Sequence, residues 1–173
     1  MGSIPPHRCH YSSTKKNQRM TRDKLNHRHA KKISSFLGIS FFHDKVGLPE
    51  CPYLHRWVAD FSLFSLRIHK WVGSDDQRHP HDHPWWFITI PIYGCYYDIL
   101  EDSKEVMWPL RIRFRPAKHQ HKVKLISKTC WTFLITGKQT RDFGFWVDGK
   151  FTKRNRYFFD FKHHPCDDHR DII

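Results

Sequence analysis

The chain lacks any pair of cysteines spaced as a thiolate zinc site or a redox motif requires. Its cysteines are odd in number and widely separated: Cys9, Cys51, Cys95, Cys130 and Cys166. Neither a disulfide framework nor a thiolate zinc site is indicated, so the simplest reading is a reducing compartment. We therefore expect a cytoplasmic protein.

Long apolar runs are also missing. No segment approaches the roughly 20 apolar residues of a membrane span, and the first thirty residues contain no hydrophobic signal core. We expect a soluble, unsecreted chain with no membrane partner. The basic, acid-poor start also resembles an organelle transit peptide, although residues 1–20 have hardly any apolar residues for an amphipathic face; organelle targeting is the alternative.

Acidic residues are scarce, with 17 Asp and Glu against 30 Lys and Arg and a formal net charge of +13. Residues 1–32 hold much of this excess, because Asp23 is their only acidic residue. Such a segment favours polyanions, and we expect a flexible basic tail that can dock on nucleic acid. The residues predicted to make these contacts are Lys15, Lys16, Arg19, Arg22, Lys24, Arg28, Lys31 and Lys32.

What the chain does contain is a real core: 39% of its residues are hydrophobic and 16% aromatic, in a length that suits one domain with an appendage. We expect an N-terminal extension over 1–52, with one short helix at about 23–37, because Leu25, Ala30, Ile33, Phe36 and Leu37 lie near helical spacing before Gly38. A folded domain over 53–162 and a C-terminal tail over 163–173 follow.

From Tyr53 onward the chain reads as one short strand after another. Segments such as FSLFSLRIHKWV, WWFITIPIYG, CWTFLIT, RDFGFWV and FTKRNRYFF are β-branched or aromatic and bounded by turn residues, and VDGK predicts a hairpin. No helix of normal length fits within 54–161. About eight short strands in one core predict an all-β sandwich or jelly-roll barrel.

Strand alternation assigns faces to two groups of histidines. In HQHKVKLI, His119 and His121 share the face of Val123, while the intervening lysines point to water. In HPHDHPWW, the same parity places His79, His81 and His83 on one side and Asp82 on the other. Imidazoles converging from two strands predict a divalent-metal site, although a chain with 15 histidines also contains such pairs by chance.

The segments HDHPWWF, RFRPAKHQHKV and WTFLITGKQTRDFGFW resemble, in this order, a group of cupin-like proteins of tailed bacteriophages and bacteria; the resemblance covers about residues 53–150. Cupins are double-stranded β-helix barrels that often hold a metal through two histidines and a glutamate of a first motif and one histidine of a second. The resemblance implies a cupin-type jelly-roll barrel, in the host cytoplasm if the chain is viral.

The resemblance places His81 and His83 on the first pair, Gly94 on the closing glycine, Pro116 on the second motif's proline and His121 on its histidine. The chain departs from the pattern where Phe87, Lys118 and Leu125 replace glutamate, glycine and asparagine. The implied site therefore has three histidine ligands, His81, His83 and His121, for iron, manganese, zinc or nickel. His119 or His79 is a candidate fourth ligand.

Further candidates lie around this site. Arg67 and His69 share a strand face and are candidates for binding a small anion, unless Leu66, Ile68 and Lys70 face inward instead. Trp86 or Trp85, but not both, can face the interior. Arg141 is a candidate for the barrel mouth, with a structural ion pair as the alternative.

Two function classes follow. The first is a metal-binding cupin-like protein acting on a small anionic substrate; if it is an enzyme, an iron-dependent oxygenase is the first choice and a metal-assisted hydrolase or isomerase the second. No catalytic base is identified. The second is a non-catalytic β-barrel module that docks through its basic tail on nucleic acid, a ribonucleoprotein or a virion. A homodimer is compatible with either.

Overall fold

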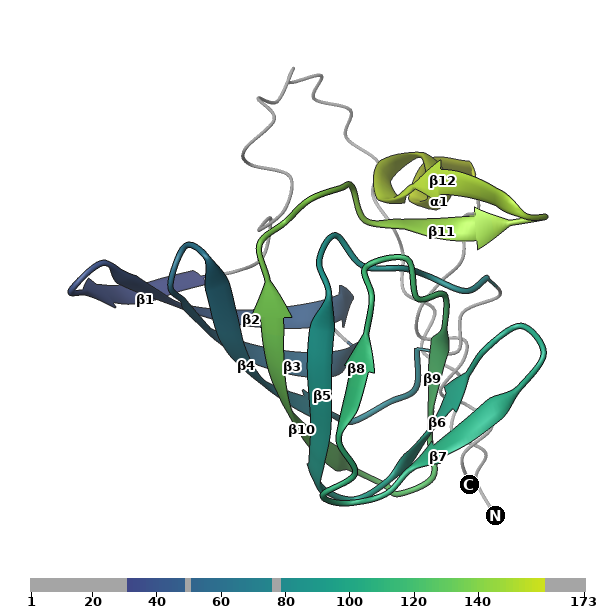
Figure 1. Ribbon diagram of the computed structural model, residues 1–173, viewed down its shortest axis with the longest axis horizontal. Coiled ribbons are helices and arrows are strands. Elements are labelled where there is room, and N and C mark those ends of the chain that lie inside the picture. Colours follow the sequence, from purple (N-terminus) through teal and green to yellow (C-terminus); the bar gives the residue numbers. More distant parts are fainter. Residues whose placement is uncertain (1–30, 49–50, 76–78, 161–173) are drawn as a thin grey trace, which may run out of the picture.

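The computed structural model describes residues 31–48, 51–75 and 79–160, and its strands curve around a common interior (Figure 1). The larger layer is an antiparallel sheet of seven strands. In spatial order these are β1 (Lys31–Phe36), β2 (Ile39–Leu48), β3 (Cys51–Asp60), β4 (Phe64–Trp71), β10 (Cys130–Gly137), β5 (Phe87–Tyr93) and β8 (Arg113–Arg115).

The second layer is assembled from shorter pieces. It contains the three-stranded sheet β7 (Lys104–Met107), β6 (Tyr96–Ile99) and β9 (Lys122–Leu125), and the hairpin β11 (Gly144–Val147) and β12 (Lys150–Lys153). His81 joins the two pieces, because it forms one bridge with His121, next to β9, and another with Phe145 of β11. A helix, α1 (Arg154–Asp160), follows β12.

The chain alternates between the layers as it runs from β4 to β11. It passes through the His81 bridge, β5, the β6–β7 pair, β8, β9 and β10 in turn, each step changing layer. This alternation of antiparallel strands between two sheets is the jelly-roll arrangement. The expected all-β jelly-roll fold is confirmed.

The apolar core fills one end of the interior. Leu54 and Trp71 of the larger sheet meet Tyr96, Met107 and Val123 of the second layer, and Cys130 lies among them. The strands bury alternate residues, as in β10 and β5, so each contributes one face to the interior. The other end of the interior is polar and holds the site described below.

The expected helix at about 23–37 is wrong where the structure describes it, since residues 31–36 form β1. Leu37 and Gly38 both have positive φ, 46° and 77°, and form the two-residue turn of a hairpin whose second strand is β2. Cross-strand pairing therefore overrides a weak helical pattern that includes the β-branched Ile33. Residues 23–30 lie outside the described ranges.

Other element boundaries also differ from expectation. The sheet begins at Lys31 rather than near Tyr53, because β2 pairs with β3 despite the intervening glycine and prolines. FTKRNRYFF is not one strand: β12 ends at Lys153 and α1 begins at Arg154, where Tyr157 packs its ring on Phe145 at 3.9 Å. The hairpin expected at VDGK is confirmed, with Asp148 and Gly149 both at positive φ.

None of the helices in the described part of the chain has the length and apolar character needed to cross a membrane. The tails expected at residues 1–24 and 163–173 lie outside the described residues.

Candidate metal centre

Three of the predicted ligands converge. His81 and His121 exchange both backbone hydrogen bonds, each N–H donating to the other's carbonyl at 3.0 Å, so their side chains lie on the same face. His83 follows two residues after His81 and points the same way, although the segment forms a single bridge rather than the strand we expected. One nitrogen from each of the three rings lies within 4.8 Å of the others.

The nitrogen spacing fits one shared cation. The Nε2 atoms of His83 and His121 are 2.9 Å apart. Two imidazole nitrogens bound to one ion at about 2.1 Å are separated by about 3.0–3.4 Å for ligand angles between roughly 90 and 110°. A small movement of either ring therefore places both nitrogens at coordination distance from one ion.

The first two candidate ligands, His81 and His83, are held in the neutral form that a metal requires. Burial lowers the pKa of His81 well below its ordinary value, and the neighbouring His121 lowers it further. Burial also lowers the pKa of His83, with His81 and His121 adding to the effect. Near neutral pH both rings are therefore uncharged, and each has one nitrogen whose lone pair a metal can use.

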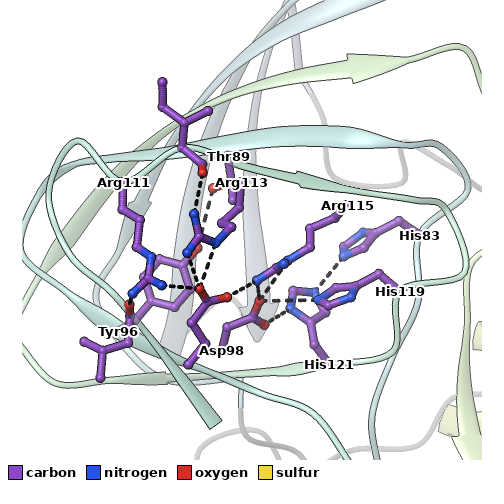
Figure 2. Close-up of polar contacts among 12 residues, drawn as sticks. His83, Thr89, Tyr96, Asp98, Arg111, Arg113, Arg115, His119 and His121 are labelled. Carbon is purple, nitrogen blue, oxygen red and sulfur yellow. Dashed lines mark hydrogen bonds and ion pairs between the residues drawn. The ribbon is translucent and has the colours of Figure 1, made fainter. Parts of the chain in front are cut away.

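Asp98 of β6 orients His121, the third candidate ligand. Its Oδ1 lies 2.5 Å from Nδ1 of His121, and because an ionised carboxylate only accepts, the ring must donate from Nδ1. This fixes the tautomer so that Nε2 presents its lone pair toward His83 (Figure 2). Carboxylates behind ligating histidines commonly have this role.

Asp98 is kept ionised by several donors. Burial alone would raise the pKa of its carboxyl, but hydrogen bonds from His119 and His121 together with the charge of Arg115 hold it well below the ordinary range. Arg115 donates from Nη2 to Asp98 at 2.7 Å and to Glu105 at 2.6 Å, and Glu105 also pairs with Arg111 and Arg113 (Figure 2). An alternating row of acids and arginines thus supports the site.

The two candidate fourth ligands lie in different places. Nε2 of His119 lies 3.3 Å from Asp98 Oδ2, and Asp98, His119 and His121 form a second group with ligand-like spacing. His119 thus lies on the shared face we expected, but behind His121. His79 instead bonds through Nδ1 to the Tyr157 hydroxyl at 3.1 Å, beside α1. The structure does not bring His79 into the cluster.

The cluster opens into a cavity of about 1100 Å³ lined by both layers. Arg67 and His69 of β4 face this cavity, so the inward orientation is the one observed. The Arg67 guanidinium lies 4.4 Å from the ring centre of Trp85, and the Trp85 ring also stacks on the His83 ring at 5.0 Å. Burial lowers the pKa of Arg67 to about 9, so it stays cationic at neutral pH.

His69 is buried and unpartnered. It is 6% exposed, and neither ring nitrogen has a hydrogen-bond partner in the described residues. Burial lowers its pKa well below the ordinary value, and Arg56 and Arg67 lower it further. An orphaned neutral imidazole beside a cationic side chain indicates a place where a polar ligand supplies the missing hydrogen bonds.

The remaining candidates take different positions. Trp86 is 39% exposed and packs beside Phe114 on the outside of the sheet, so Trp85 is the tryptophan that lines the cavity. Arg141 lines the cavity as well, but its Nη1 pairs with the fully buried Asp82, which is the structural ion pair we held as the alternative. Asp82 thus faces away from the histidines, as its parity predicts.

Phe87 occupies the position of the glutamate in the resembling pattern. It is 3% exposed, and its ring meets the His83 ring edge-on at 4.6 Å. Asp75 is another carboxylate beside the cluster, with Oδ2 3.7 Å from His81 Nε2 and Oδ1 accepting the Val123 N–H at 2.5 Å. The cluster is therefore apolar on one side and acidic on the other.

Sequence reasoning missed Asp98, Asp75 and Arg115. Asp98 shared strand parity with Tyr96 in YYDIL, and an acid on the face of an aromatic residue is a signal that could have identified it. Arg115 and Arg113 alternate on RFR in the same way. The position of Asp75, in a loop, carries no comparable signal.

Neither a scan against family models nor a search of curated proteins gave a match. Distant similarity extends to solved structures. AerE from Microcystis aeruginosa has a TM-score of 0.46 and 15% identity over 58% of this chain and 48% of its own. KdgF from Halomonas sp. has a TM-score of 0.45 and 17% identity, over 56% and 88%.

A cupin superfamily protein from Desulfitobacterium hafniense has a TM-score of 0.44 and 11% identity, over 50% of this chain and 78% of its own. The chain spans about half the length of AerE. Because one fold hosts many activities, these similarities transfer no function.

Proposed function

We propose that the protein binds one divalent transition-metal ion through His81, His83 and His121 and uses it on a small anionic ligand. The observation that carries this proposal is the convergence of three histidine nitrogens within 4.8 Å of one another, beside a cavity of about 1100 Å³. Neutral imidazole suits iron, zinc and nickel, whereas manganese, the fourth ion that the resemblance implies, prefers oxygen ligands. Bound there, such an ion acts as a Lewis acid, and iron adds chemistry with O₂.

The side chains around the ligands define what the site can hold. Arg67 presents a planar guanidinium that matches a carboxylate or phosphate, and its stacking on Trp85 holds that plane in place. His69 lines the same cavity with two free ring nitrogens and can donate or accept one hydrogen bond with a bound ligand. Phe143 and Phe145 flank His81 and exclude water from that side of the cluster.

If the protein is an enzyme, an oxygenase is the reaction that we propose first, and a metal-assisted hydrolase or isomerase second. The ligand set supports either, since three neutral histidines leave open coordination positions. The chain's own contribution is to hold the anion at Arg67, keep His81 and His83 unprotonated and orient His121 through Asp98.

The test is elemental analysis of purified, untagged protein. We expect about one metal ion per chain in the wild type and a loss of metal in His83→Ala and in the double variant His81→Ala, His121→Ala. His79→Ala is the matched control, because it removes a histidine of the same run that lies outside the cluster. Circular dichroism of each variant checks the fold, and equal metal content in all folded variants overturns the proposal.

A second candidate function is docking on nucleic acid through the basic segment 1–32. Its composition favours it, and Lys31 and Lys32, the part within the described residues, lie exposed on β1. Removing residues 1–30 should weaken the binding of RNA and DNA. It should also make the affinity depend less on salt, because a chain with fewer phosphate contacts releases fewer counterions when it binds. Unchanged affinity removes this role and leaves the metal proposal untouched.

A further inference from the structure

The seven-stranded sheet has a second face, turned away from the cavity. Strand register places three rows of five residues on this outer face. The first row is Lys45, His55, Lys70, Trp131 and Tyr93; the second is His43, Trp57, Ile68, Phe133 and Ile90; the third is Phe41, Ala59, Leu66, Ile135 and Ile88. These rows cross β2, β3, β4, β10 and β5 (Figure 1).

Near-parallel rings run along the outer face. His43 stacks on Trp57 with centroids 5.0 Å apart and planes 18° apart, and Trp57 stacks on Trp131 at 5.9 Å and 6°. Trp131 ends this run beside Tyr93, which is 65% exposed. Unpaired bases stack on aromatic rings that a sheet presents with one ring face uncovered.

The charge on this face has one sign. None of the residues in the three rows is acidic, while Lys45 and Lys70 stand on either side of His55. Lys70 also holds its ammonium 5.5 Å from the centre of the Trp131 ring. Burial lowers the pKa of His55, and the charges of Lys45, His43 and Lys70 lower it further, which reports a positive local field.

Two more features bear on the ligand of this face. A hollow of about 290 Å³ lies beside Trp57, lined by apolar side chains that include Ile33, Ile68 and Phe133. Lys31 pairs with His43 at the edge of the second row and is exposed, so it adds a further basic residue beside this row.

From this arrangement we propose that the outer face binds single-stranded nucleic acid, with a base stacked on Trp131 at the open end of the run and phosphates held by Lys45 and Lys70. A duplex keeps its bases stacked on each other and offers no free ring face to the tryptophans. An apolar protein partner would bury both lysines without supplying acids. The inference extends the second candidate function and is independent of the metal site.

The experiment measures fluorescence anisotropy of labelled oligouridine and oligothymidine with the full chain across a range of salt. Trp131→Leu removes one stacking ring and should weaken binding about 5- to 150-fold. Lys45→Gln with Lys70→Gln should lower the slope of log affinity against log salt by about 1.4, since each lost contact with a single strand accounts for about 0.7. The two oligonucleotides distinguish RNA from DNA.

Lys118→Gln with Lys150→Gln is the charge-matched control, because both lysines are exposed and lie off the three rows. It should change affinity less than the outer-face pair does. Metal content should stay equal in all variants, so failure here is separable from failure of the metal site. Equal oligonucleotide affinity of the outer-face and control variants overturns the proposal. So does a wild-type chain that binds no oligonucleotide but forms a dimer that Trp131→Leu dissociates.

Discussion

Replacing Asp98 with Asn tests how the carboxylate of Asp98 supports the histidine cluster. The carboxylate receives donors from three residues: His121 at 2.5 Å, His119 at 3.3 Å and Arg115 at 2.7 and 3.1 Å. An asparagine keeps the shape but has one acceptor oxygen and a donating amide in place of the second. It can serve His121 or Arg115, but not both.

The expected loss has two parts. Removing a carboxylate that orients a ligating histidine typically lowers metal affinity 10- to 100-fold, or about 1.4–2.7 kcal/mol. Arg115 is only 14% exposed and keeps Glu105 as a partner, so the loss of its ion pair with Asp98 should cost about 1–3 kcal/mol of the free energy of unfolding, less than the about 3–5 kcal/mol of a buried charge left alone. That is a large share of a typical domain's stability, so the variant should be handled in the cold.

Competition with a chelating dye measures the affinity, and urea unfolding of the apo and loaded protein measures stability. Glu105→Gln is the control, because Glu105 also binds Arg115, with its carboxylate 24% exposed, and no hydrogen bond to a histidine is found for it in the described residues. It should lose less stability and no metal affinity. Metal affinity that is unchanged in Asp98→Asn would refute the orienting role.

Three further outcomes are expected. His81 and His83 have lowered pKa values in the folded chain, so as the pH falls their rings take up protons in the unfolded chain before they do in the folded one. The free energy of unfolding and the retention of metal should therefore fall below about pH 6.5. Unfolding and metal release measured at about pH 7.5 and about pH 5.5 check this. Arg141→Met leaves the buried Asp82 unpaired and should cost about 3 kcal/mol in urea unfolding. Gly94→Ala should lower the free energy of unfolding by at least about 1–2 kcal/mol, because Gly94 has a φ of 70° and a Cβ there meets a backbone oxygen. An unchanged melting temperature would contradict this.

The convergence of the three histidines could be predicted because side chains keep their alternation of faces even where no regular strand forms. His81 forms one bridge pair with His121, and a hydrogen-bonded pair places opposite side chains on one face just as a full strand would. The prediction of His79 fails at the same point: the chain leaves this pairing before residue 81, and His79 turns to Tyr157.

The supporting residues could not be predicted in this way, because they depend on which strands become neighbours. Asp98 meets His121 only because β6 pairs with β9 in a register that places Asp98 opposite Val123. That pairing spans residues distant in sequence. The misassigned helix has the same cause, since β1 becomes a strand through its pairing with β2.

The positions of the negatively charged side chains limit the class of ligand that the proposed site can bind. Phe87 puts a ring where the resembling pattern has a carboxylate, and the charge of Asp98 is already balanced by Arg115. Three neutral imidazoles do not offset the charge of a bound divalent ion, the Asp75 carboxylate 3.7 Å from His81 offsets only part of it, and Arg67 adds a second cation to the same cavity. A small ligand with two acidic groups, or one acidic group and an oxygen donor, neutralises both cations, whereas a neutral sugar or amine neutralises neither.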